Sequence, residues 1–110
     1  MNCGICKAHL RSKNPCHGCN IIDRNIAKHC STCHIRNCQE RKGKFCFNCN
    51  QFPCKRIIQL DKRYIEKYGM SEINNLEYIR ENGITKFIKR ERENWQSQKG
   101  ILCVHDKKFY

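Results

Sequence analysis

The sequence has few ordinary apolar residues, and most of them lie in its second half. Hydrophobic residues make up 39% of the 110 when cysteine is counted. Residues 1–56 hold only twelve apolar side chains other than cysteine, against twenty in residues 57–110. So few side chains bury too little surface to offset the entropy of ordering the backbone. The first half therefore needs another source of stability, and the chain is too short for a large enzyme core.

Long hydrophobic runs and targeting signals are also missing. No apolar run approaches the ~20 residues that a membrane-spanning helix requires. Met1 and Asn2 are followed at once by Cys3, without the basic and apolar regions of a secretion signal. Cys103 lies too far from the last residue for a prenylation motif. We therefore expect a cytoplasmic protein without a membrane partner.

The motifs of common active sites are absent as well. Pro15, Cys16 and Cys19 match half of the zinc deaminase signature, but no His-x-Glu precedes them. The sequence contains neither a His-Glu-x-x-His pair nor a phosphate-binding glycine loop. Zinc sites made only of cysteine are normally closed and structural. We expect a protein that is not an enzyme and has no small-molecule substrate.

Cysteine is abundant where apolar residues are scarce. Such density indicates disulfides in an oxidising compartment or metal in a reducing one, and the expected cytoplasmic location favours metal. Ten of the eleven cysteines lie in the first half, and we take all ten as candidate metal ligands: Cys3, Cys6, Cys16, Cys19, Cys30, Cys33, Cys38, Cys46, Cys49 and Cys54.

The first four cysteines form two Cys-x-x-Cys pairs nine residues apart. This spacing lets both thiolates of one tight turn reach a single tetrahedral ion at ~2.3 Å, so structural zinc sites use such pairs two at a time. The pairs Cys3/Cys6 and Cys16/Cys19 therefore predict one complete zinc site.

The remaining six cysteines form an internal repeat. The pattern Cys-x2-Cys-x4-Cys occurs in residues 30–38 and again, sixteen positions later, in residues 46–54. Six thiolates in this order could hold two zinc ions. Alternatively, the four cysteines of the two pairs hold one ion, and Cys38 and Cys54 are small buried side chains. Both schemes, and a cross-braced pairing, are open, so two or three Zn²⁺ are expected per chain. An iron–sulfur cluster is the less favoured alternative.

The second half shows helical periodicity. Apolar residues at helical spacing predict a helix over 55–68 that stops at Gly69. Ser71 is the expected N-cap of a second helix over 72–82. Thr85 is the expected cap of a third helix that reaches Trp95, a candidate core anchor, and Leu102 to Val104 are a candidate strand.

These patterns predict a small, metal-stabilised α fold with minor β structure. A cysteine-rich zinc-knuckle head of residues 1–56 is expected to precede about three amphipathic helices in residues 57–110, packed with it as one compact domain.

Several segments resemble an uncharacterised cysteine-rich domain family of bacteria and archaea. The resemblance runs from Cys3 to Trp95, with Phe52-Pro53-Cys54 as its most specific part. It is carried by residues 3–6, 16–19, 33–38, 42–43, 45–46, 49–54, 63–64, 68–71, 75–76 and 83–84. It implies zinc binding in a prokaryotic protein and no established activity. The family resemblance also implies further cysteines after the tryptophan, of which Cys103 and His105 would be the remnant here. From the residues alone, Cys103 is expected to be a small buried side chain.

The chain is strongly basic. Its formal charge of +12 would still be about +8 after zinc-bound thiolates are counted. Basic side chains next to aromatic ones suit phosphate neutralisation and base stacking. The candidate nucleic-acid contacts are Arg36, Arg41, Lys42, Lys44, Lys55, Arg56 and Phe47.

We therefore expect a zinc-binding interaction protein that contacts nucleic acid through its basic head. One alternative is an adaptor, or a small inhibitor of a nucleic-acid-processing complex, that docks on an acidic protein surface. A second alternative is an iron–sulfur or thiol redox protein.

Overall fold

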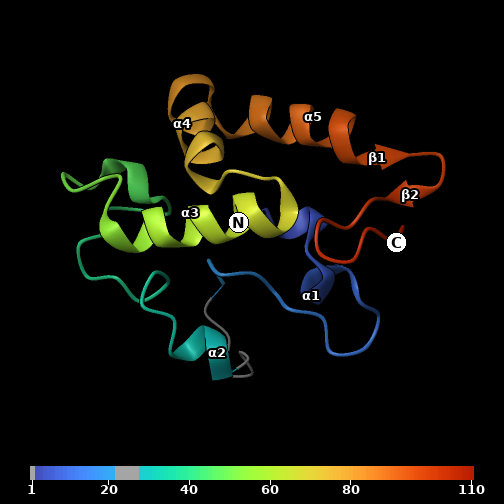
Figure 1. The fold of residues 1–110 in the computed structure, drawn as a ribbon, viewed down its shortest axis with the longest axis horizontal. Helices are drawn as coiled ribbons and strands as arrows, with labels where there is room; N and C mark the ends of the chain where they lie inside the picture. The colour runs from blue at the N-terminus through green and yellow to red at the C-terminus, as the bar shows by residue number, and fades with distance from the viewer. Residues whose placement is uncertain (1, 22–27) are drawn as a thin grey trace. The chain divides into compact units, whose positions relative to one another are not determined.

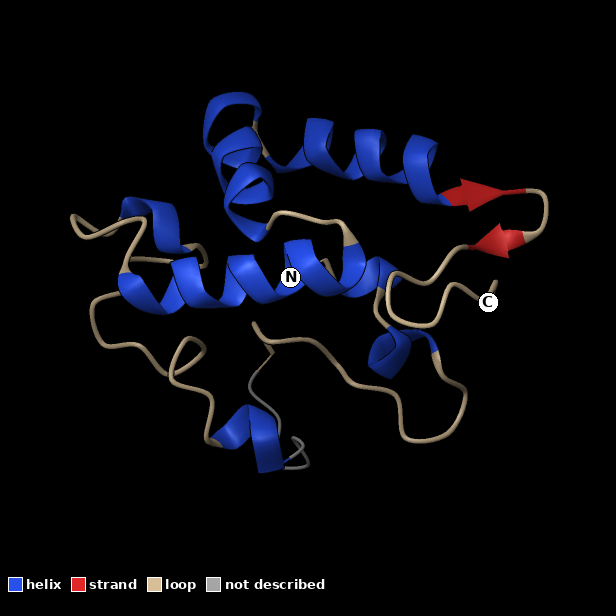
Figure 2. Cartoon of the chain, in the orientation of Figure 1, coloured by secondary structure: helices blue, strands red, loops and turns tan. Residues whose placement is uncertain are grey.

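The computed structural model describes residues 2–21 and 28–110, and these are mainly helical with one small sheet (Figure 1; Figure 2). The helices are α1 (Lys7–Leu10), α2 (Lys28–Ser31), α3 (Lys55–Tyr68), α4 (Glu72–Asn82) and α5 (Ile84–Trp95). Two 3-10 turns, η1 (Cys3–Ile5) and η2 (Cys46–Asn48), and the strands β1 (Gln96–Ser97) and β2 (Gly100–Ile101) complete the described elements.

The chain forms two compact units. Unit 1 comprises Met1–Asn37 and Arg90–Tyr110, and unit 2 comprises Cys38–Lys89, so the division falls within α5. Residues of one unit make most of their backbone contacts with each other. The expected division into a zinc-stabilised head of residues 1–56 and a helical part of residues 57–110 was based on what stabilises each half, and it stays a prediction.

Helix α3 has the predicted bounds. Ile57 and Tyr64 are buried at 3% and 8% exposure, so the apolar stripe of the sequence becomes the core face of unit 2. Gly69 ends the helix in the left-handed conformation, with φ of 67°, and donates its N–H to the Ile65 carbonyl.

Helix α4 also has the predicted bounds, and its N-terminus is tied to α3, against which it packs (Figure 1). The Ser71 hydroxyl oxygen accepts the Asn74 N–H at 3.1 Å, which confirms Ser71 as the N-cap. Asp61 of α3, only 9% exposed, accepts hydrogen bonds from the Ser71 hydroxyl and the Ile73 N–H, both at 2.9 Å. This carboxylate therefore satisfies a donor that the helix leaves free.

Helix α5 begins two residues earlier than a cap at Thr85 implies. It starts at Ile84, so Thr85 lies inside the helix and its prediction as the cap is wrong. The reason is the short connection: Gly83 both ends α4, with φ of 86°, and accepts the Phe87 N–H through its carbonyl. Phe87 is buried, whereas Ile88 is 44% exposed.

After α5 the chain turns back as a short hairpin in unit 1. Strands β1 and β2 pair antiparallel, with Gln96 opposite Ile101. The predicted strand over Leu102 to Val104 is wrong: Leu102 makes an isolated bridge to Phe109, and the next two residues enter a turn. Trp95 is only half-buried, so it is not the predicted core anchor, and its Nε1–H donates to Glu91 at 3.2 Å.

Candidate metal centres

The first cysteine pair is held in a tight turn by backbone hydrogen bonds. The Cys6 N–H donates to the Cys3 carbonyl at 3.0 Å, and the Asn2 side chain caps the same turn through the Gly4 N–H at 3.0 Å. The backbone N–H groups of Ala8 and of the next residue donate to the Cys6 sulfur. Such N–H groups stabilise a thiolate, because they place positive dipoles against its charge.

The second pair lies beside the first. The Cys16 N–H donates to the Ala8 carbonyl at 2.7 Å, and the His9 imidazole bonds to the Cys16 carbonyl at 2.6 Å through Nδ1. Gly18 has φ of +98°, and a Cβ there would lie 3.6 Å from the Cys3 sulfur. The backbone at Gly18, between Cys16 and Cys19, therefore lies close to the Cys3 sulfur.

The third pair has the same backbone form as the first. The Cys33 N–H donates to the Cys30 carbonyl at 3.3 Å, and the Cys33 sulfur accepts the Arg36 N–H at 3.5 Å. The Cys30 thiol hydrogen-bonds with that of Cys16. Cys30 is therefore a neighbour of the second pair within unit 1.

The fourth pair lies at the two ends of η2 in unit 2: Cys46 begins it and Cys49 is its C-cap. The Cys49 N–H donates to the Cys46 carbonyl at 3.0 Å, and the Cys49 sulfur accepts the Gln51 N–H at 3.4 Å. Cys54, the last of the ten, is the N-cap residue of α3. The chain between them contains a cis peptide bond before Pro53.

Burial is the main reason why several of these thiols hold their protons. It raises the pKa of Cys6, Cys19, Cys30 and Cys46, and neighbouring sulfur atoms raise each of them further. For Cys46 the positive charge of Arg41 acts in the opposite direction. A cation bound among these sulfurs would reverse the effect, because a coordinating thiol is deprotonated outright.

These influences identify which sulfurs are neighbours. In unit 1 the pKa of Cys19 is raised by Cys3, Cys16 and Cys30 after the larger effect of burial. In unit 2 the pKa of Cys46 is raised by Cys54 and Cys38, again after burial. Unit 1 contains six of the ten predicted ligands, and unit 2 contains the other four.

All eleven thiols are free, since no cysteine takes part in a disulfide. Within residues 2–21 and 28–110, no three cysteine, histidine, aspartate or glutamate side chains form a group that could hold a metal ion. The fit to zinc therefore depends on the donor chemistry: paired sulfurs, and backbone N–H groups directed at them.

Cys103 lies apart from this set. It is fully buried, as expected for a small side chain, and its thiol hydrogen-bonds to Asp106. His105 accepts the backbone N–H of Lys7 at Nδ1, at 3.3 Å. Both members of the suggested C-terminal metal remnant thus have protein partners.

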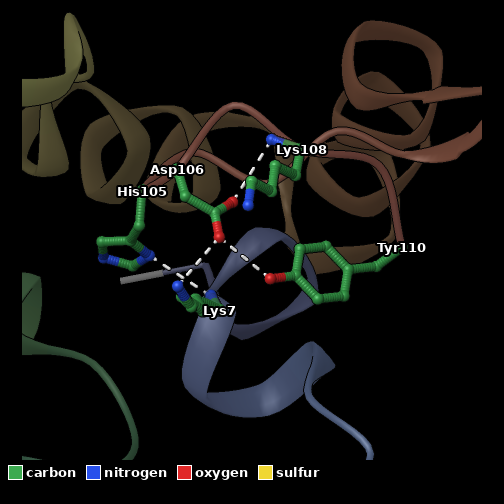
Figure 3. Close-up of polar contacts among 5 residues, drawn as sticks. All are labelled: Lys7, His105, Asp106, Lys108 and Tyr110. Carbon is green, nitrogen blue, oxygen red and sulfur yellow. Dashed lines mark hydrogen bonds and ion pairs between the residues drawn. The ribbon is translucent and has the colours of Figure 1, made fainter.

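The C-terminal residues His105 to Tyr110, here called the C-terminal hook, contact Lys7, the residue after the first cysteine pair (Figure 3). Asp106 is at its centre: Oδ2 lies 3.0 Å from the Lys7 Nζ and accepts the Tyr110 hydroxyl at 2.9 Å, while Oδ1 accepts the Lys108 N–H at 3.2 Å. Although burial raises the pKa of this carboxyl, the bonds from Lys7 and Tyr110 outweigh it and hold the pKa well below its usual range. Sequence patterns did not indicate these residues, because they form no motif.

A second link joins the hook to the first pair itself. The Val104 N–H donates to the Ile5 carbonyl at 2.9 Å, and both side chains are buried. The turn of Cys3 and Cys6 is therefore held in unit 1 at two positions: at Ile5 by Val104, and at Lys7 by His105 and Asp106.

The predicted nucleic-acid residues are distributed over both units. Phe47 stacks on Phe45 in unit 2, with ring centroids 5.3 Å apart and an angle of 12° between the planes. Lys42 and Lys44 are exposed in the same loop, and Arg41 is half-buried beside Cys46.

The other three predicted contacts lie elsewhere. Lys55 and Arg56 are exposed in the first turn of α3. Arg36 belongs to unit 1, and its guanidinium donates to the Ile21 carbonyl at 3.2 Å and to the Asn37 side chain at 3.3 Å.

Comparisons with known proteins give one family and no closer relative. No curated protein and no solved structure matches the chain. None of the helices in the described ranges is both long enough and apolar enough to cross a membrane. The profile of a family described as "Protein of unknown function (DUF3795)" matches residues 1–59, and the chain belongs to that family.

Proposed function

We propose that the protein is a non-enzymatic, zinc-binding interaction protein of prokaryotes. One observation carries the proposal: in three Cys-x-x-Cys pairs the second cysteine donates its N–H to the first carbonyl and accepts a later backbone N–H at its sulfur. Cys-x-x-Cys spacing lets both sulfurs of such a turn reach one ion, and the N–H groups offset thiolate charge. Both features are what a tetrahedral Zn²⁺ site requires.

Metal analysis of the protein purified without added metal tests this proposal. We expect two or three Zn²⁺ per chain and no visible colour. Iron with inorganic sulfide and a brown absorbance would instead establish the iron–sulfur alternative. A metal-free chain that is fully folded would contradict the zinc proposal, because structural zinc sites and their folds form together.

The partner that we propose is nucleic acid, bound through unit 2. The Phe45–Phe47 stack, at the start of η2, directly follows the exposed Lys42 and Lys44 in the chain, so aromatic and cationic side chains occur in one short segment. Aromatic stacking contributes about 1–3 kcal/mol per base, and lysine neutralises phosphate. A single-stranded partner suits this arrangement, since its bases are free to stack.

Binding to single-stranded and duplex oligonucleotides, measured over a range of salt concentrations, tests this step. Phe47→Ala is expected to weaken single-strand binding by about 10-fold or more. Lys44→Gln should reduce the salt dependence as well as the affinity. Lys86→Gln, an exposed lysine on α5, is the matched control. No binding to either nucleic acid at low salt, with capture of an acidic protein instead, would favour the adaptor alternative.

A further inference from the structure

We infer that one exposed face of helix α3 is a docking surface for an acidic, amphipathic helix of a partner protein. This face, here called the α3 seam, consists of Lys55, Ile58, Lys62 and Ile65. It lies outside residues 42–47, which carry the proposal of nucleic-acid binding, and it requires neither zinc nor nucleic acid. The partner helix is defined by its chemistry: apolar side chains opposite the isoleucines and carboxylates opposite the lysines.

The spacing of the α3 seam is that of a helix–helix interface. Its four residues follow one another at intervals of three, four and three positions, which places them on one side of an α-helix. The same intervals separate the a and d positions of a coiled coil, where each side chain inserts between four residues of the facing helix. The seam extends over about 15 Å of helix, or roughly three turns. It therefore fits a short helical segment of a partner.

The isoleucines of the seam are exposed, although other apolar residues of α3 are buried. Ile58 and Ile65 are each 49% exposed, whereas Ile57 and Tyr64 are buried in the core of unit 2. A single exposed isoleucine is common on a protein surface, but two of them seven positions apart form a row. An amphipathic helix binds through anchors at this spacing. The seam is therefore a second apolar row on α3, separate from the one that forms the core.

The charge of α3 determines the charge of the partner. Five lysine and arginine side chains of this helix are exposed: Lys55, Arg56, Lys62, Arg63 and Lys67. Of its two carboxylates, Asp61 is buried and bonded to the start of α4, so Glu66 is the exposed one. An acidic helix is attracted to such a surface, and a basic helix is repelled by it.

Other occupants fit the α3 seam less well. A second copy of this chain would bring two cationic helices together, in a protein of formal charge +12. Nucleic acid binds single-stranded bases through aromatic rings, and the seam contains none. A lipid surface requires a broad apolar face, but Ile57 and Tyr64 are already turned into the core. An acidic helix is the occupant that uses both the isoleucines and the lysines.

Binding of a designed peptide to the full-length protein tests the proposal. The probe is a fluorescein-labelled helix of about three heptads, with leucine at the d positions and glutamate at the a and g positions. A peptide of the same composition in scrambled order is its control. Fluorescence anisotropy should show saturable binding of the designed peptide at micromolar concentrations. The scrambled peptide should bind at least about 10-fold more weakly.

Variants with matched controls locate the binding. Ile58→Ala and Ile65→Ala should each weaken it by about 5- to 10-fold. Lys62→Glu should weaken it by about 10-fold or more and reduce its dependence on salt. The controls are Ile84→Ala, at a 44% exposed position on α5, and Lys67→Glu, about 140° around α3 from Lys62. Each control should change the affinity by less than about 3-fold.

Absence of binding by the designed peptide, or equal affinity for the scrambled one, would overturn the proposal. Equal losses in the seam variants and their controls would do the same, because binding would then be general electrostatic attraction. The proposal also fails if Ile58→Ala weakens binding to a single-stranded oligonucleotide or to phosphatidylserine vesicles as much as binding to the peptide. Peptide binding without any oligonucleotide binding would refute the proposed nucleic-acid partner and support the docking surface.

Discussion

Three of the eleven cysteine sulfurs accept hydrogen bonds from the backbone. Backbone N–H groups are directed at Cys6, Cys33 and Cys49, and these are the second members of their pairs. Their positions follow from the turn, because the same backbone path that returns the second N–H to the first carbonyl also exposes later N–H groups. Cys-x-x-Cys spacing therefore predicted the turn at three of the four pairs, while the second pair, Cys16 and Cys19, lacks that hydrogen bond. The spacing says nothing of which pairs share a metal ion.

Asp106 is a residue whose contribution depends on charge. Because its folded-state pKa lies below the ordinary value, its stabilisation is present above about pH 4 and is lost as the pH falls through the folded-state pKa. Asp106→Asn should therefore lower the melting temperature at pH 7 and flatten its decline in acid. Thermal unfolding from pH 2 to 7 measures both effects.

Glu93→Gln, at an exposed position on α5, is the control for that substitution. It should leave the pH profile close to that of the wild type. Equal profiles for Asp106→Asn and the wild type would mean that the bonds to Lys7 and Tyr110 contribute no net stability.

Ser71 tests the link between α3 and α4. Ser71→Ala removes the cap on the Asn74 N–H and one of the two donors to the buried Asp61 carboxylate. We expect a loss of about 1 kcal/mol in the free energy of unfolding from the cap alone. Urea unfolding followed by circular dichroism measures it, with Ser12→Ala, in an exposed loop, as control. Equal midpoints for the two variants would exclude this capping role.

At the scale of the element, helices were easier to predict than strands. The stripes in residues 55–68 and 72–82 predicted α3 and α4 with correct bounds, because period and capping residues agree there. The prediction of Thr85 as a cap was wrong because Gly83, which ends α4, leaves only a short connection, and α5 begins before Thr85. The prediction of a strand over Leu102 to Val104 was wrong because a short apolar run is as compatible with a buried turn as with a strand.

The core face of α3 gives a prediction with an internal control. Ile57 is 3% exposed and its neighbour Ile58 is 49% exposed. Ile57→Ala should cost about 2–5 kcal/mol of unfolding free energy, whereas Ile58→Ala should change it by less than about 0.5 kcal/mol. Chemical denaturation of both variants checks the difference. Similar losses would show that α3 is oriented differently from the arrangement described here.

For the whole molecule, metal binding is expected to depend steeply on pH. Thiols whose pKa is raised, as at Cys6, Cys19, Cys30 and Cys46, hold protons that zinc must displace. Lower pH therefore favours the protonated, metal-free form. A site of four such thiols should lose up to about 10⁴-fold in zinc affinity per pH unit below the thiol pKa. Chelator competition at pH 6, 7 and 8 measures this slope, and a pH-independent affinity would contradict thiolate ligation.

The interruption of unit 1 by unit 2 was beyond what the sequence could predict. The segment Arg90–Tyr110 joins the first 37 residues through contacts such as Val104 to Ile5, and these rest on ordinary backbone groups and buried side chains. Periodicity and spacing describe neighbours along the chain. They carry little information about partners about a hundred positions away.

This interruption has a consequence for synthesis on the ribosome. Cys38–Lys89 is one continuous stretch, so unit 2 can close as soon as its last residues leave the exit tunnel. Unit 1 needs residues from 90 onward, although its six candidate metal ligands are all translated before residue 37. The first cysteines to be made are therefore the last whose unit is completed. During elongation they stay open to oxidation and to competing metals for longer than the four that follow them.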